Sequence, residues 1–142
     1  MDLIEATARK CEVITRLAAA GGIENARAIP ERAEDWADGE GREAYDAVTA
    51  RALAPLSVIA EYASPLLREG GALVAWKGSR NEDEEAQGAA AAGKLGFSEP
   101  EVLRVEPFEG AANRHLHVVR KIAATPEGFP RRAGMARKRP LG

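Results

Sequence analysis

The 142-residue sequence contains very little cysteine or histidine, and this scarcity excludes several classes of site. The single cysteine, Cys11, cannot form an intramolecular disulfide, and no group of cysteines and histidines has the spacing of a zinc site. His115 and His117 alternate along a predicted strand and have no nucleophile or third ligand beside them. We therefore expect no structural metal, no redox role and no nucleophilic triad, and we interpret both histidines as strand-surface residues.

Long hydrophobic runs are also absent. No apolar stretch approaches the roughly 20 residues that span a bilayer, and the first five residues lack the basic-then-apolar layout of a secretory signal. The 45% hydrophobic content suffices for one domain with a core. We expect a soluble, cytoplasmic monomer without a membrane partner.

Charge is present but unevenly distributed. The chain carries a net charge of -2, which does not favour extensive contact with nucleic acid. The segment Thr125–Gly142, however, has five basic residues against one acid, a net charge of +4, so the remainder carries -6. No core pattern continues after Ile122. The sequence thus predicts a folded domain over residues 1–122 and a basic C-terminal tail over residues 123–142 that extends from an acidic body.

Hydrophobic periodicity predicts alternating strands and helices. A short apolar strand at Leu3-Ile4 precedes a helix whose apolar face is Cys11, Ile14, Leu17 and Ala18. A helix beginning at Pro55 would bury Leu56, Ile59, Ala63, Leu66 and Leu67 and end at Gly70-Gly71, and Asn81 would cap a helix running to about Leu95. Strands are predicted at residues 26–29, 45–50, 72–76, 102–105 and 116–122. The run 72–76 is continuously apolar, as in a strand covered on both faces. This order indicates a doubly wound α/β sheet that ends with an antiparallel strand.

Several polar residues follow the predicted strands, at the edge of the sheet where α/β folds bind ligands. Glu5 follows the first strand, where a carboxylate can accept hydrogen bonds from ribose hydroxyls, although a helix-start acid is the commoner use of such a residue. Ala33-Glu34 could meet an adenine edge or form a solvated turn. Arg51 could hold a carboxylate or phosphate, or could be a surface arginine. Lys77 and Gly78 occupy the same edge.

Segments in a fixed order resemble the ribosomal RNA small-subunit methyltransferase G family, also called glucose-inhibited division protein B. The matching segments are Leu3–Ala6, Glu31–Glu34, Tyr45–Ala52, Trp76–Gly78, Arg114–Leu116, Arg120–Ile122, Thr125-Pro126, Phe129–Gly134 and Lys138–Leu141. The resemblance implies a Rossmann-like class I methyltransferase fold. It also implies transfer of a methyl group from S-adenosylmethionine to N7 of one guanine in 16S ribosomal RNA.

The resemblance further implies residue roles. Glu5, Ala6 and Thr7 match the ribose-side contact of the cofactor, Ala33 and Glu34 the adenine-side contact, and Arg51 an arginine of the cofactor pocket. Phosphate contacts with RNA would come from Lys77, Arg131, Arg132, Lys138 and Arg139. The family's first strand and glycine-rich loop have no counterpart in the sequence, so we expect an N-terminally truncated fold with an unpaired edge on strands that are interior in the family.

Two alternatives remain open at this point. A non-catalytic RNA-binding fragment would explain the basic tail and the absence of a glycine-rich loop. A nicotinamide-type dinucleotide domain would explain an acid after the first strand. It is the weaker alternative, because a sheet and one acid do not determine function.

Overall fold

The chain forms two separate β-sheets flanked by helices, as seen in a computed structural model that describes residues 1–142. A small parallel sheet pairs β1 with β2, and a larger sheet has the strand order β3-β4-β6-β5. The strands are β1 (Asp2–Ile4), β2 (Arg27–Ile29), β3 (Tyr45–Arg51), β4 (Leu67–Lys77), β5 (Glu101–Val105) and β6 (Arg114–Arg120). The helices are α1 (Ala8–Ala20), α2 (Ala33–Ala37), α3 (Leu56–Ala63), α4 (Glu82–Lys94) and α5 (Met135–Lys138).

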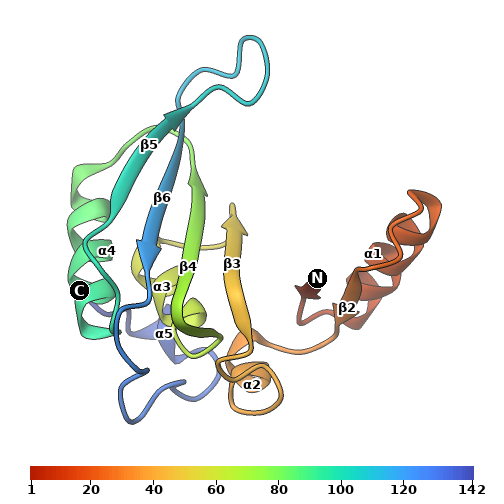
Figure 1. Cartoon of the computed structure of the whole chain (residues 1–142), viewed down its shortest axis with the longest axis horizontal. Helices are drawn as coiled ribbons and strands as arrows, with labels where there is room; N and C mark the ends of the chain where they lie inside the picture. Colours follow the sequence, from red (N-terminus) through yellow and green to blue (C-terminus); the bar gives the residue numbers. More distant parts are fainter.

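The predicted antiparallel ending of the sheet is confirmed. β3 and β4 run parallel, whereas β6 is antiparallel to both β4 and β5. The two sheets are not joined by hydrogen bonds between strands, so β1 and β3 are each paired with only one neighbouring strand. Figure 1 shows the pair β1/β2 and helix α1 standing to one side of β3. No helix in the structure has the length and apolar character to cross a membrane.

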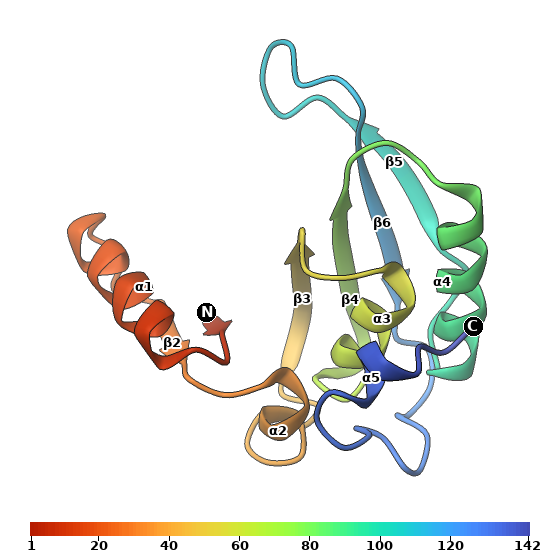
Figure 2. The ribbon, with the colours of Figure 1, turned by 180° about the vertical axis from the view of Figure 1, so that it is seen from behind.

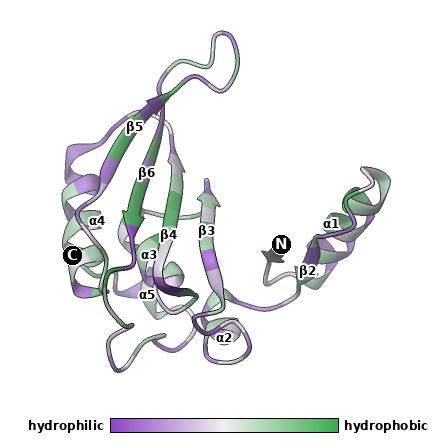
Figure 3. Ribbon diagram, viewed as in Figure 1, coloured by the Kyte–Doolittle hydropathy of each residue, from purple (hydrophilic) through white to green (hydrophobic).

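Helices cover only one face of the larger sheet. α3, α4 and α5 all lie on the same side of the strands, as the two opposite views in Figures 1 and 2 show. Along β4, Leu73 and Ala75 are buried whereas Val74 and Trp76 are only partly buried. The prediction that residues 72–76 are covered on both faces is therefore wrong. Figure 3 shows the apolar character that produced this prediction, concentrated in β4, β5 and β6.

The predicted end of the helix after Pro55 is also wrong. α3 ends at Ala63, and Pro65 separates it from β4, which begins at Leu67. Gly70, expected to stop a helix, instead lies within β4 with a φ of 83° and donates its N–H to the carbonyl of Lys121. A positive φ is accessible to glycine at little steric cost, so this residue accommodates an irregularity in the strand.

The apolar face predicted for α1 is only partly buried. Cys11 is 6% exposed, which confirms its assignment to the core, but Leu17 is 66% exposed. α1 packs chiefly on β2 and has no second layer of structure on its other side. Helical periodicity identified this helix correctly but could not show that its apolar face has little to pack against.

The C-terminal tail does not extend freely from the body. Ala136 is 1% exposed, and Phe129 and Leu141 pack against the main core cluster. α5 contacts α3, and Figure 2 shows the tail crossing the helical face of the larger sheet. The expectation of a tail without core contacts is wrong, because isolated apolar residues among the basic ones anchor it.

Candidate functional site

The carboxyl edge of the small sheet brings two of the predicted cofactor-binding segments together. In the parallel register Ile4 is paired with Ile29, so Glu5 and Pro30 leave the sheet at the same end. The N–H of Glu5 donates to the carbonyl of Ile29 at 3.1 Å, which extends this pairing by one residue. Ala33 begins α2 three residues after Pro30. This edge therefore positions Glu5 close in the fold to the segment that carries Ala33.

The Glu5 carboxylate is held in an ionised, hydrogen-bond-accepting state. Its Oε1 accepts the backbone N–H of Thr7 at 2.8 Å, and its Oε2 lies 3.4 Å from Nζ of Lys10. The Thr7 N–H, with a smaller contribution from Lys10, lowers the pKa of Glu5 below its usual value. A carboxylate has about four acceptor positions. Glu5 can therefore accept hydrogen bonds from hydroxyl groups in addition to these two contacts. Ala6 and Thr7, which follow it, are exposed.

Ala33 and Glu34 differ in the groups that they offer to a ligand. α2 begins without a side-chain cap from Arg32, so N–H groups in its first turn remain available to an acceptor. Glu34 is only 7% exposed, and its Oε1 accepts the N–H of Gly134 at 2.7 Å. Glu34 thus holds the C-terminal tail with its carboxylate, and only backbone groups of this segment are free for a ligand.

The larger sheet presents Arg51 and Lys77 at the carboxyl ends of adjacent parallel strands. Arg51 is paired with Trp76 in the register, so Lys77 follows at the same edge. Arg51 is exposed, and its side chain makes no hydrogen bond or ion pair within the chain. Lys77 is different, because its Nζ lies 2.5 Å from Oε1 of Glu84 and its side chain is 21% exposed. Arg51 is accordingly the cation at this edge that is free to meet an anionic group.

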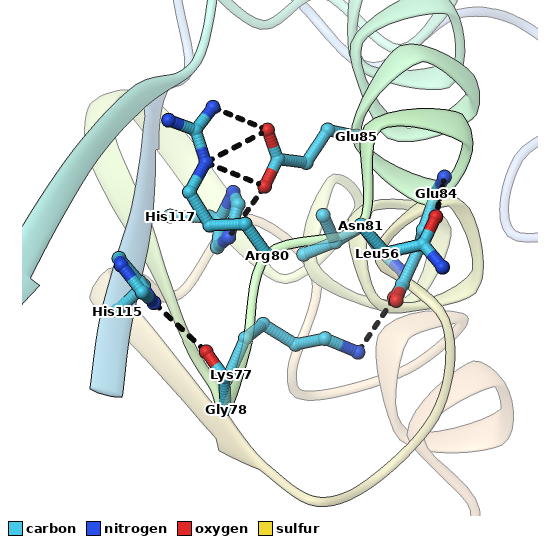
Figure 4. A network of polar contacts seen from close by, with 9 residues as sticks. All are labelled: Leu56, Lys77, Gly78, Arg80, Asn81, Glu84, Glu85, His115 and His117. Carbon is cyan, nitrogen blue, oxygen red and sulfur yellow. Dashed lines mark hydrogen bonds and ion pairs between the residues drawn. The ribbon is translucent and has the colours of Figure 1, made fainter. Parts of the chain in front are cut away.

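A network of polar contacts joins this edge to α4 (Figure 4). Asn81 caps α4 by accepting the N–H of Glu84, as the sequence predicted, and Glu84 also accepts the N–H of Leu56 at 3.0 Å. His115 donates from Nδ1 to the carbonyl of Gly78 at 2.8 Å. Glu84 is therefore engaged in structure, in addition to its favourable position at a helix N-terminus.

The predicted RNA-contacting residues of the tail divide into two groups. Arg131 forms a bidentate ion pair with Glu61, with distances of 2.6 Å from Nε to Oε1 and 2.5 Å from Nη2 to Oε2. Because the Glu61 side chain is only 3% exposed, this ion pair fixes the tail to α3. Arg132, Lys138 and Arg139 are exposed and can reach an external partner.

Sequence reasoning missed a polar cluster that connects the small sheet to the larger one. Oη of Tyr45 donates to Asp2 at 2.5 Å and accepts Nε1–H of Trp36 at 2.8 Å. Arg27 makes two hydrogen bonds to the same Asp2 carboxylate and lies over the Trp36 ring, 5.6 Å from its centroid. These residues are far apart in the sequence, and no local pattern indicated that they meet.

A buried lysine was missed for the same reason. Lys121 has a side-chain exposure of 0%, and its Nζ donates to the carbonyls of Ser64 and Leu67 and to Oγ1 of Thr125. Burial lowers the pKa of Lys121, while Glu43 at 3.9 Å opposes this effect. The three acceptors indicate that Lys121 joins β6, the start of β4 and the tail.

Comparison with known proteins gives a family match and close sequence relatives. The family model described as rRNA small subunit methyltransferase G matches residues 1–117. A protein of that name from Pelotomaculum thermopropionicum is 41% identical over 99% of the chain, which spans 59% of the relative's length. A protein of the same name from Deinococcus deserti is 41% identical over 97% of the chain, which spans 57% of that relative.

Solved structures with low sequence identity share the fold. A SAM-dependent O-methyltransferase from Thermotoga maritima matches with a TM-score of 0.65 at 13% identity, over 89% of this chain and 51% of that one. A 16S rRNA methyltransferase from T. Thermophilus, in complex with AdoMet and guanosine, matches with a TM-score of 0.58 at 19% identity, over 88% of this chain and 30% of that one. The predicted Rossmann-like methyltransferase fold is confirmed.

Proposed function

Because the chain belongs to the rRNA small subunit methyltransferase G family, we propose that it forms the nucleoside-binding part of an enzyme that methylates N7 of a guanine in 16S ribosomal RNA, with S-adenosylmethionine as methyl donor. The observation that carries the proposal is the carboxyl edge of the small sheet, where an ionised Glu5 lies beside the uncapped start of α2. The chain spans less than two thirds of its relatives, so the proposal concerns the activity of the whole protein.

The residues of this edge fit a nucleoside. Glu5 accepts hydrogen bonds from the two ribose hydroxyls, because its carboxylate retains acceptor positions beyond Thr7 and Lys10. A backbone N–H in the first turn of α2, at Ala33 or Glu34, donates to a nitrogen of the adenine edge. S-adenosylmethionine, when bound, supplies a methyl group on a positively charged sulfur.

The absence of a catalytic base suits the proposed acceptor atom. Guanine N7 carries a lone pair on an exposed base edge, so the attack requires no removal of a proton. The protein then has to align the reactants and bring them close together, and this alone can provide a large acceleration. Arg51, exposed and unpaired at the end of β3, serves to orient an anionic group of the cofactor or of the RNA.

RNA contacts are assigned to the exposed cations of the tail. Arg132, Lys138 and Arg139 bind phosphates, and such contacts provide salt-dependent affinity and correct placement more than base selection. Arg131 and Lys77 act indirectly, since their ion pairs with Glu61 and Glu84 hold the tail and the β4 edge in position. The proposed substrate places the protein in the cytoplasm.

Cofactor binding provides the first test. We expect Glu5→Gln to weaken the affinity for S-adenosylhomocysteine about tenfold or more in calorimetry, because hydrogen bonds to a charged group are worth roughly 1.5–3 kcal/mol. Glu12→Gln, an exposed acid on α1, is the matched control and should leave the affinity unchanged. Equal affinities of Glu5→Gln and the original chain would remove Glu5 from the site.

Methyl transfer provides the second test. 7-Methylguanosine in 16S RNA is measured by mass spectrometry, both for the chain alone and for the chain joined to the N-terminal part of a full-length relative. We expect transfer by the joined protein and a higher KM for S-adenosylmethionine in its Glu5→Gln form. If no 7-methylguanosine is formed by either protein, the assigned reaction is wrong.

A non-catalytic RNA-binding role is the second candidate, and the exposed cations Arg132, Lys138 and Arg139 favour it. It predicts affinity for RNA that does not need the cofactor and that falls steeply as salt is raised from about 50 to 200 mM. This outcome together with the absence of methyl transfer by the joined protein would select it over the enzyme.

A further inference from the structure

A cavity of about 310 Å³ lies between α4 and the strands of the larger sheet, close to the carboxyl end of β4, but neither Arg51 nor Lys77 lines it. Its walls come from α3, β4, α4, β5 and β6, and they are mainly apolar, with Leu73, Val102 and Val119 on the strands. From α4 the apolar part of the lining consists of small side chains, those of Ala86, Ala89 and Ala92, and Glu85 adds a carboxylate. The cavity opens toward the segment that precedes β5, where Glu99 and Pro100 form part of its rim.

The cavity has a simple origin in the sequence. The helix α4 packs closely on α3, and a Cβ added at Gly88 would lie 2.7 Å from Cβ of Leu56. Apart from Glu85, the side chains by which α4 lines the cavity are alanines, which have too little volume to fill the space. Protein interiors are normally close-packed, so the alanines leave an unfilled space, which is open to solvent on the side where Ala86 and Glu99 are exposed.

One polar side chain in the wall has no hydrogen-bond partner within the protein and only a distant charged neighbour. His117 is 5% exposed and lines the cavity, yet its ring makes no hydrogen bond. Its nearest charged neighbour is Oε1 of Glu85, 3.8 Å from Nε2, and Arg80 already holds this carboxylate with three contacts of 2.5–3.2 Å (Figure 4). No side-chain nitrogen or oxygen of the protein is both fully buried and unpaired, so the ring nitrogens of His117 are accessible from the cavity and free to bind a ligand.

The charges around the imidazole favour a neutral ligand. Burial lowers the pKa of His117, with Arg80 and His115 acting in the same direction and Glu85 and Glu84 opposing it. The ring is therefore neutral at pH 7 and offers one donor and one acceptor nitrogen. Arg80 and Glu85 neutralise each other, and Glu99 at the rim disfavours anions.

We propose that this cavity binds a small neutral aromatic molecule with a single polar hydrogen, of the phenol or indole type, which donates that hydrogen to the imidazole of His117. An apolar cavity of about 150 Å³ is sufficient for benzene. The present cavity is large enough for one or two fused rings, and pockets of about 300 Å³ and above are typical of small-molecule sites.

The chain has its own spectroscopic probe for this site, because His115 and His117 are its only two histidines. Indole, phenol, benzene and benzoate are titrated separately while the ring nitrogen and carbon resonances are recorded by NMR. We expect a saturable shift of His117 with indole and with phenol, while His115, hydrogen-bonded to Gly78, stays constant. Benzene should bind about fivefold more weakly than phenol, because it lacks the hydrogen bond, and benzoate should bind more weakly than phenol.

Variants distinguish binding of the aromatic molecule in the cavity from its adsorption to the protein surface. Ala89→Leu fills the cavity from α4 and should abolish the His117 shift, whereas Ala90→Leu, at an exposed position of the same helix, should leave it intact. Val102→Phe fills the cavity from β5 and provides the same test if Ala89→Leu does not fold. His117→Phe should remove the preference for phenol over benzene, measured by ligand-observed NMR.

The proposal is overturned by any of three results. Indole and phenol at millimolar concentration produce no saturable shift of His117, or the shift survives in the folded cavity-filling variants, or benzoate binds at least as tightly as phenol. Retention of the phenol preference in His117→Phe would also remove the histidine from the site.

Discussion

The N-terminal unit, residues 1–29 with β1, α1 and β2, is held in place in a different way from the body, residues 33–142. The body has a core cluster of 12 buried residues from β3, α3, β4, α4, β6 and the segment that follows α4. In the N-terminal unit only Cys11 and Ile29 are buried, and Val13, Leu17 and Ile23 are 40%, 66% and 48% exposed. Burial of apolar surface is the main stabilising contribution in folded proteins. The unit must therefore depend more strongly than the body on specific polar contacts.

These contacts converge on Asp2. Its carboxylate accepts one hydrogen bond from the hydroxyl of Tyr45 in β3 and two from Arg27. These contacts lower the pKa of Asp2 from 3.8 to about 2. Arg27 acts mainly through its hydrogen bonds, and Tyr45 adds to the effect. Ile4 also packs against the small cluster around Trp36 and Leu66. The unit that carries Glu5 is thus joined to the body by a polar cluster and a small apolar contact.

Removing the ion pair that fixes the tail to the body should have the largest effect on stability. We expect Arg131→Met to lower the free energy of unfolding by about 3–5 kcal/mol, because it leaves the buried carboxylate of Glu61 without its partner. The measurement is denaturant unfolding followed by circular dichroism. Arg132→Met, at the adjacent exposed position, should change stability by less than about 0.5 kcal/mol. Equal losses in the two variants would show that the ion pair does not hold the tail.

Breaking the connection between the two regions should have a smaller and local effect. Tyr45→Phe removes the hydroxyl that joins Asp2 and Trp36, and we expect a loss of about 1–2 kcal/mol. Hydrogen exchange should accelerate at the amides of β1 and β2 while those of β4 and β6 keep their protection. Uniform acceleration across both sheets would mean that the N-terminal unit and the body unfold together, contrary to the comparison above.

The sequence predicted the elements of both regions better than their contacts. Capping by Asn81, the burial of Cys11 and the antiparallel ending of the sheet follow from local rules of spacing and chemistry, and all were confirmed. The end of α3 was misplaced because the apolar period continues through Leu66 and Leu67, past the break at Pro65. Periodicity alone cannot distinguish the last turn of a helix from the start of a buried strand.

Contacts between distant segments could not be predicted. Arg131 was assigned to RNA because its local surroundings are basic, and nothing in the sequence indicated that Glu61 lies beside it. Glu34 was assigned to adenine, whereas its side chain meets Gly134, 100 residues later. The roles of Glu5, Ala33 and Arg51 remain predictions, but their placement at strand ends follows from the alternation of strands and helices that the sequence made visible.

Lowering the pH should also affect the stability of the two regions differently, and this is the smallest of the expected effects. The neutral form of His117 is favoured in the folded body, because burial lowers its pKa below 6.5. Below pH 6.5 the unfolded chain binds a proton at this residue that the folded chain does not bind, so stability falls as the pH is lowered toward the folded-state pKa. One group contributes at most about 1.4 kcal/mol per pH unit. Asp2 behaves differently because its pKa is lowered in the folded state. Its contribution to stability is complete above pH 3.8 and is lost only as the pH falls from 3.8 toward about 2.

Denaturant unfolding at a series of pH values between 7 and 5 measures this difference. We expect the stability of the original chain to decrease over this range and His117→Phe to lose the His117 contribution to the slope, while His115→Phe, which alters the other histidine, should retain it. The amides of β1 and β2 should show no additional opening over the same range, because Asp2 remains ionised and bound to Arg27 and Tyr45. An identical slope in His117→Phe and the original chain would assign the acid sensitivity to other groups. Selective opening of β1 and β2 at pH 5 would mean that the N-terminal unit, and not the core around His117, is the acid-sensitive region.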